Sequence, residues 1–250
     1  MYQKIDRSFI GEGIIHARLY GSQDPFLPLG NCDAFSISYA TNRKTLPNYM
    51  GGGGNRNVNE KPSDVTGSLG MYDITADNVA LVTRGTIKVN PTTAITDEPH
   101  TSAGVLGELI PFKYLPDPTK TLTVKTAGDV ACVAGTDYLA TPHGIQVLSG
   151  SKIDATGVKV SYTPRASKSV HMLNGSQQEF ELFIAGLNDA QSGEPFALRP
   201  RRAKFGLLQE FSVLGQEYTK LTGPCELLAD PNVTASDISK FCQMDLAEAA

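Results

Sequence analysis

Two stretches between residues 34 and 71 alternate regularly between apolar and small polar side chains. In "AFSISY" and "VTGSLGM", every second position is apolar or glycine, and the positions between are mostly serine or threonine. A period of two residues predicts β-strands with one buried and one solvated face. We expect the packing face to comprise Phe35, Ile37, Tyr39, Val65, Leu69 and Met71. The opposite, polar face carries Ser36, Ser38, Thr66 and Ser68.

The connection between these two strands is long for a β-hairpin. Residues 45–62, "TLPNYMGGGGNRNVNEKP", hold four consecutive glycines and also the apolar side chains of Leu46, Tyr49, Met50 and Val58. Hairpin connections usually have about two to five residues, and longer loops are commonly functional or disordered. A linker that stays in water has no need of apolar side chains. The segment therefore predicts an arm that becomes ordered against a neighbouring subunit.

The next stretch, "DITADNVALVTRG", predicts a short helix. Asp73 or Thr75 can cap its first turn, and Gly85 can end it. An approximate apolar stripe is formed by Ile74, Val79 and Val82. Because the helix directly follows the hairpin, we expect it to cover one face of the sheet.

Short β-prone runs separated by Gly, Asp or Pro resume after residue 119, for example "TLTVKT", "GIQVLS" and "GVKVSYTP". Further on, "EFELFI" places Phe180, Leu182 and Ile184 on one face of a strand and Glu179 and Glu181 on the other. The chain is therefore predicted to be mainly β with a short flanking helix, an α+β class. We expect a single domain over residues 1–250, with room for a small β subdomain at about residues 119–165. The pattern of residues 86–118 does not distinguish helix from strand.

Composition and charge narrow the class of protein. Hydrophobic residues make up 40% of the chain and charged residues 19%, which is typical of a globular protein. The net charge of -4 argues against a free-standing nucleic-acid binder that neutralises phosphates. The basic run "RPRRAK" is better explained as a solvated or subunit-facing strand edge. Neither a signal peptide nor a long apolar run is present, so we expect a protein without a membrane span that is made in a cytoplasm.

No residue pattern indicates catalysis. The glycines 51–54 lead into a strand and lack the helix and the Lys-Ser/Thr pair of a phosphate-binding loop. The four histidines are isolated, the four cysteines form no CxxC motif, and no GxSxG elbow occurs. We therefore expect no catalytic residue, no cofactor and no metal site.

The order of these patterns resembles that of the major tail proteins, or tail tube proteins, of long-tailed bacteriophages. The resemblance is carried by "PFLPLGNCDAFSISYATNRKTLPNY", "GGGGNRNVNEKPSDVTGSLGMYDITADNVALVTRG", "AGTDYLATPHGIQVLSGSKIDATGVKVSYTP" and "EFELFIAGLNDAQSG". It implies a β-sandwich or barrel-like fold that is completed when six copies close into a ring. Stacked rings would form the hollow tail tube through which the genome is ejected.

The same resemblance assigns roles and partners. The arm between rings would comprise Leu46, Tyr49, Met50, Gly51, Gly52, Gly53, Gly54 and Arg56. The face towards the lumen would comprise Ser36, Ser38, Thr66 and Ser68, with Glu179 and Glu181 adding negative charge if their strand joins the same barrel. Partners would be further copies of the chain, other tail proteins such as the tape measure and terminator, and double-stranded DNA that passes without sequence-specific binding. The protein would be assembled in the host cytoplasm and reside in the virion tail.

Two alternatives share part of this pattern. The tube of a contractile secretion system follows the same ring-stacking physics. A β-rich surface module that binds carbohydrate is a second alternative, although the chain contains no Trp to stack on sugars.

Overall fold

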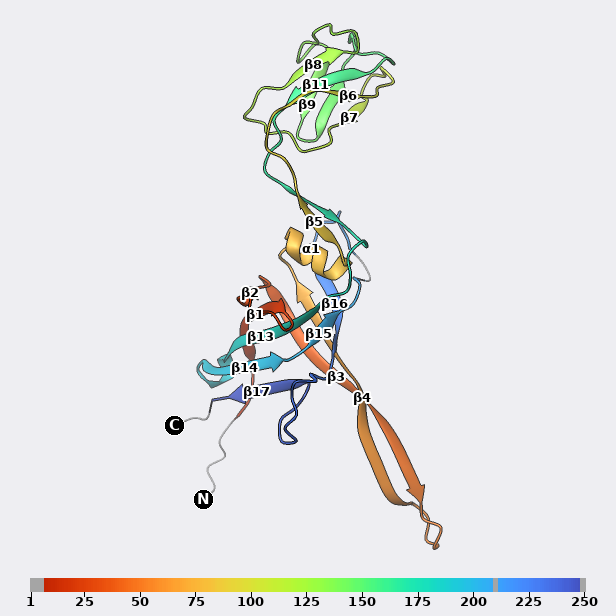
Figure 1. The fold of residues 1–250 in the computed structure, drawn as a ribbon, viewed down its shortest axis with the longest axis vertical. Helices are drawn as coiled ribbons and strands as arrows, with labels where there is room; N and C mark the ends of the chain where they lie inside the picture. Colours follow the sequence, from red (N-terminus) through yellow and green to blue (C-terminus); the bar gives the residue numbers. More distant parts are fainter. Residues whose placement is uncertain (1–6, 209–210, 248–250) are drawn as a thin grey trace. The chain divides into compact units, whose positions relative to one another are not determined.

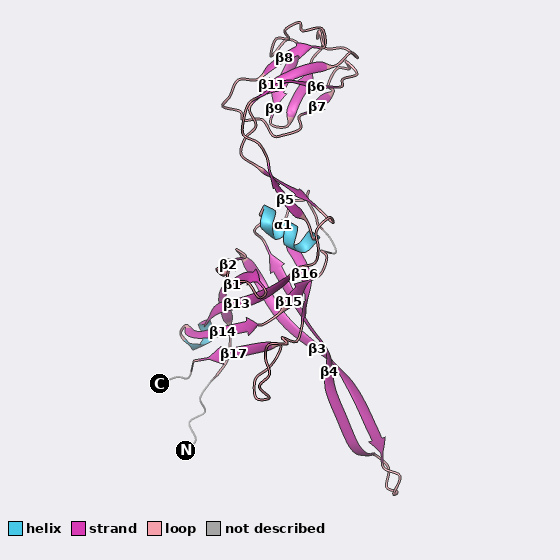
Figure 2. Cartoon of the chain, in the orientation of Figure 1, coloured by secondary structure: helices cyan, strands magenta, loops and turns pink. Residues whose placement is uncertain are grey.

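The computed structural model describes residues 7–208 and 211–247, and this part of the chain is built almost entirely from β-strands (Figures 1 and 2). Its one α-helix is α1, Ala76–Thr83. The expected class, mainly β with one short helix, is confirmed.

The chain divides into two compact units. Unit 1 comprises Met1–Thr86 and Val170–Ala250, and unit 2 comprises Ile87–Ser169. Unit 2 is wider than the small β subdomain expected at 119–165, because it also takes in residues 87–118. The chain crosses between the units twice, through β5 (Thr86–Val89) and β12 (Lys168–His171), which pair with each other.

Unit 1 contains one large, mostly antiparallel sheet. Its central path runs in the order β17-β14-β13-β15-β16-β4-β3, and β1 pairs with the other side of β13 and with β2. The strands are β1 (Gly11–Leu19), β2 (Leu27–Pro28), β3 (Cys32–Pro47), β4 (Asn55–Met71), β13 (Glu179–Asn188), β14 (Glu194–Pro200), β15 (Ala203–Phe205), β16 (Leu221–Leu227) and β17 (Cys242–Leu246). A short 3-10 helix, Asp189–Gln191, connects β13 to β14.

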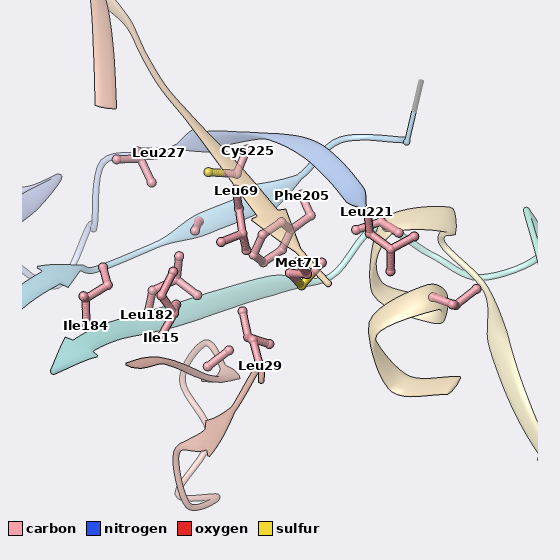
Figure 3. Packing of buried hydrophobic residues seen from close by; sticks show 14 residues of the cluster. Ile15, Leu29, Leu69, Met71, Leu182, Ile184, Phe205, Leu221, Cys225 and Leu227 are labelled. Atoms are coloured by element: carbon pink, nitrogen blue, oxygen red, sulfur yellow. The ribbon is translucent and has the colours of Figure 1, made fainter. Parts of the chain in front are cut away.

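The core of unit 1 lies against one face of this sheet. Alternate residues of β16 are buried, and they meet the buried ends of β4 and β13 (Figure 3). Leu69, Met71 and Leu221 are almost completely buried. Helix α1 closes this side through Val79 and Val82, so that the opposite face of the sheet is left without a covering layer of its own chain.

Helix α1 begins as its sequence predicts, but its left-handed C-cap is Arg84 and not Gly85. The Thr75 side chain accepts a hydrogen bond from the Asn78 backbone N–H at 3.1 Å, which identifies Thr75 as the N-cap. At the other end Arg84 adopts a left-handed conformation, and the Gly85 N–H donates to the Ala80 carbonyl.

The hairpin of β3 and β4 is longer than expected and its turn is shorter. Thr45 pairs with Val58 and Pro47 with Asn55, so only Asn48–Gly54 lie outside the ladder, not the whole of residues 45–62. The register shifts between Cys32 and Ala34, between Leu46 and Pro47, and between Ala40 and Thr41, where β4 carries an extra residue. Beyond this bulge the two strands leave the sheet and project as a ribbon (Figure 1). Residues 40–47 and 55–64 are all exposed.

Unit 2 is a small sandwich with its own core. The sheets β7-β10-β9 and β6-β11-β8 enclose buried side chains that include Ile145, Val160 and Tyr162. The strands are β6 (Ile95–His100), β7 (Leu109–Pro111), β8 (Thr123–Thr126), β9 (Tyr138–Thr141), β10 (Gly144–Val147) and β11 (Val158–Tyr162). Asp137 is buried beside this core, where it accepts hydrogen bonds from the backbone N–H groups of Val133 at 2.7 Å and Lys152 at 2.9 Å.

We expect Asp137→Ala to destabilise unit 2 by about 2 kcal/mol, because two partly buried backbone N–H groups lose a charged acceptor. These N–H groups lower the pKa of Asp137, Val133 contributing most. A depressed folded-state pKa means that the stabilisation is complete above the unfolded pKa and is lost as pH falls through the folded pKa. Urea unfolding, monitored by amide hydrogen exchange within residues 87–169, measures both effects.

Lys159→Met is the matched control, because Lys159 pairs with Asp129 on the surface of the same unit. It should change the free energy of unfolding by less than about 1 kcal/mol. Equal losses in the two variants would contradict the structural role of Asp137.

Candidate functional site

The polar side of the unit 1 sheet forms one surface across six strands, from β3 to β13 and on to β1. Cross-strand pairing aligns Ser38 of β3 with Thr66 of β4, Thr66 with Glu226 of β16, Glu226 with Lys204 of β15, and Lys204 with Glu179 of β13. Directly opposed residues of antiparallel strands project from the same face. We call this surface the polar face: it comprises Ser36, Ser38, Thr66, Ser68, Thr222, Glu226, Lys204, Glu179, Glu181 and Arg18.

The structure thus brings together the six residues that the sequence proposed for a lumen. Ser36 and Ser68 are opposed, and their hydroxyl oxygens lie 2.7 Å apart in a hydrogen bond. The two glutamates lie on β13 of the same sheet, and the register places them on the same side as the serines.

The carboxylates of this face are paired. Glu179 accepts two hydrogen bonds from the guanidinium of Arg202, at 2.6 and 2.9 Å, and Glu181 accepts one from Arg18 at 2.6 Å. The Arg202 hydrogen bond lowers the pKa of Glu179 and raises that of Arg202. Glu179 and Glu181 therefore add no unpaired negative charge to the face, contrary to the expectation from the sequence.

The opposite, packing face ends before the ribbon begins. Leu69 and Met71 are buried, and Phe35, Ile37 and Val65 pack partly covered against the unit 1 core. Tyr39 was also expected to pack here, and this expectation was wrong: its side chain is 72% exposed. Tyr39 pairs with Val65 at the last covered position, just where β3 and β4 run past the edge of the core.

The projecting ribbon, residues 40–64, is basic and partly apolar. It contains Arg43, Lys44, Arg56 and Lys61 against Glu60 and Asp64, a net charge of +2. Within residues 7–208 and 211–247 none of these four cations forms an ion pair, and Glu60 accepts a hydrogen bond from Thr41. The apolar members of the proposed arm, Leu46, Tyr49 and Met50, are all exposed.

The glycines at the tip make a tight turn. Gly51, Gly52, Gly53 and Gly54 all have positive φ angles, between 71° and 93°. Four successive residues in this region strongly favour glycine, since other side chains pay a steric cost there. Asn48 closes the turn: its N–H donates to the Gly54 carbonyl and its side-chain amide donates to the Gly51 carbonyl. The glycines thus shape a hairpin end, and a strand follows them where a phosphate-binding loop has a helix.

No sequence pattern placed Arg18 and Lys204 on the polar face, although Lys204 belongs to the basic run "RPRRAK" that was expected at a solvated or subunit-facing strand edge. Arg18 is 163 positions away from Glu181 along the chain, and Lys204 is brought beside Glu179 only by the pairing of β13 with β15. One signal did exist for Glu226. The alternation in "LTGPCEL" predicts a strand whose polar positions include it.

We also searched the described part of the chain for metal sites and membrane-spanning helices. There, no group of three or more His, Cys, Asp and Glu side chains is placed to hold a metal ion. Among residues 7–208 and 211–247, no helix has the length and apolar character needed to cross a membrane.

A family model described as "Protein of unknown function UCP028589" matches residues 8–245. The chain belongs to this family. No curated protein matches the chain.

The family match includes both units and the whole ribbon. It covers β1 at one end and most of β17 at the other, so the complete polar face lies within the part that is shared with the family. Both the polar face and the ribbon therefore lie within the matched residues.

We expect Arg202→Met to lower the free energy of unfolding of unit 1 by about 1–2 kcal/mol, because it leaves the half-buried Glu179 without its bidentate partner. The pKa of Glu179 should rise towards its ordinary value. Adding Glu179→Gln should recover part of the loss, which a double-mutant cycle in urea measures.

Arg199→Met serves as the control, because Arg199 pairs with Asp245 where both side chains are about half exposed. Its effect should stay below about 0.5 kcal/mol. A cycle without coupling between Glu179 and Arg202 would show that this pair does not stabilise the polar face.

Proposed function

We propose that this chain is the structural subunit of a bacteriophage tail tube. Copies close into rings, six by the resemblance of the sequence, and the rings stack into a hollow conduit for the genome. The observation that carries the proposal is the polar face: six strands of one sheet present a mostly polar, solvated surface on the side away from the core, in which Pro224 lies opposite Ser68.

The open margin of the sheet supports ring closure. β3 is the outermost strand of its branch, and no described strand pairs with its outer side along 16 residues. Unpaired strand edges readily take up another strand, and closing a sheet into a barrel removes them. The branch of the sheet that contains β1 has a second open edge. There β2 pairs only with His16 and Ala17 of β1, so the rest of that edge can pair with a neighbouring copy.

The electrostatics of the polar face suit passage of DNA. Glu179 with Arg202 and Glu181 with Arg18 form neutral ion pairs. The other two charged residues of the polar face, Lys204 and Glu226, have opposite charges and are aligned across β15 and β16. A surface with balanced charges and hydroxyl groups gains little from counterion release when DNA approaches. The duplex would slide past this face without being held or strongly repelled.

The ribbon supports stacking. A two-stranded hairpin without a covering layer is marginally stable in water, yet this one extends past the core with Tyr49 and Met50 exposed at its end. Packing against a neighbouring ring would cover those side chains. We propose this as the function of the arm.

Purified protein at high concentration should form rings or tubes in negative-stain images. A variant in which residues 44–59 are replaced by Asn-Gly should keep the fold, since the removed residues touch no core, but should not form tubes. Circular dichroism and urea unfolding check the fold. A wild-type protein that remains monomeric at every concentration would overturn the proposal, and tubes from the shortened variant would remove the role of the arm.

Assembled Ser38→Lys protein should retain labelled double-stranded DNA that wild-type tubes release. Each ring gains one cation per copy on the polar face, and retention should weaken steeply with salt. Thr93→Lys is the charge-matched control, because Thr93 is exposed and lies in unit 2. Equal DNA retention in the two variants would show that the polar face does not meet the DNA.

A further inference from the structure

Charge is divided unevenly within the chain. The whole protein has a net charge of -4, and the ribbon of residues 40–64 has +2, which leaves -6 for the rest. The ribbon is thus a cationic projection on an anionic body. Its four cations have no carboxylate partner within the described part of their own chain.

A second exposed apolar feature of unit 1 lies at the far end of the same hairpin. Residues 212–219 form a loop between β15 and β16, in which Leu214 is 90% exposed and Tyr218 is 92% exposed. Thr219 closes the loop by donating its hydroxyl hydrogen to the Ser212 carbonyl at 2.9 Å. We call residues 212–219 the apical loop.

The position of the apical loop follows from the strand register. The loop leads into Leu221, which pairs with Met71, whereas the ribbon tip lies beyond the pairing of Pro47 with Asn55. The two features therefore stand at opposite ends of β3 and β4. With 16 residues in β3, they are separated by roughly 50 Å at about 3.3 Å per residue.

The surroundings of the apical loop are acidic. Glu217 lies in the loop itself and is exposed. Lys220, directly after the loop, is already paired with Asp33 and lies over the ring of Tyr72. Asp73 follows Tyr72 in the chain, and Asp77 occupies the first turn of α1.

We propose that the ribbon of one copy docks on the apical loop of a second copy. This inference rests on the proposed function and names the partner surface of the arm. Exposed apolar groups meet on both sides, with Tyr49 and Met50 from the tip against Leu214 and Tyr218 from the loop. The cations of the ribbon meet the exposed carboxylate of Glu217 in the loop, so opposite charges adjoin an apolar centre.

The geometry makes this contact head-to-tail. The two surfaces lie at opposite ends of one unit, so a copy that donates its ribbon still offers a free apical loop. Such a heterologous contact does not saturate in a pair and continues into a ring or an open stack. A contact between two ribbons would instead be isologous and would stop at a dimer.

Cross-linking between two variants tests the assignment. Met50→Cys and Leu214→Cys proteins are mixed under assembly conditions and treated with a short bismaleimide, and wild-type protein measures the background from the native cysteines. We expect the mixed dimer to exceed that background by at least about tenfold, because groups held at an interface experience a high effective concentration. Leu106→Cys replaces Leu214→Cys as the control, since Leu106 is 66% exposed in unit 2.

The outcomes separate this inference from the proposed function. Cross-linking of Met50→Cys to itself, or equally to Leu106→Cys, would overturn the docking site. Rings or tubes in parallel electron micrographs without the expected cross-link would also overturn it while leaving the tube function in place. Absence of any assembly would overturn both.

Discussion

A two-stranded ribbon has no interior, and this constraint governs how unit 1 is arranged. Side chains on β3 and β4 are covered only where the core of the unit lies beneath them, up to Ile37 and Val65. Beyond that point hydrogen bonds between the strands continue while hydrophobic burial stops. The hydrogen-bonded ladder alone contributes little net free energy. The ribbon is therefore the part of the described chain with most to gain from contact with another molecule.

The two faces of the unit 1 sheet also differ in how far they are covered. One side is filled by apolar residues and closed by α1, and the other consists of hydroxyl groups and paired charges. Half-buried pairs such as Glu179 with Arg202 stay hydrated, because both side chains remain about one quarter exposed. Such a surface is stable in water without a protein partner. Within unit 1 the polar face is therefore stable in contact with water. The ribbon, in contrast, leaves apolar side chains exposed.

Sequence reasoning located the strands well where one face is buried and poorly elsewhere. The alternation around Phe35 and Leu69 reflects burial, so both strands and their packing face were predictable, as was the capping of α1 by Thr75. The run "TNRKTLPN" has no such alternation because neither of its faces is covered, and its strand character emerged only from the pairing with β4. Tyr39 was misplaced since a pattern does not reveal where the core ends. The partners of Glu179 and Glu181 depend on strand register over long sequence separations, which no local pattern encodes.

Unit 2 reaches the rest of the protein through two neighbouring strands, β5 and β12. Paired strands lie about 4.8 Å apart, so the chain leaves unit 1 and returns to it at almost the same point. Unit 2 is therefore an inserted domain whose two ends are adjacent. Replacing it with another domain whose termini are adjacent would not alter the order of strands in the large sheet.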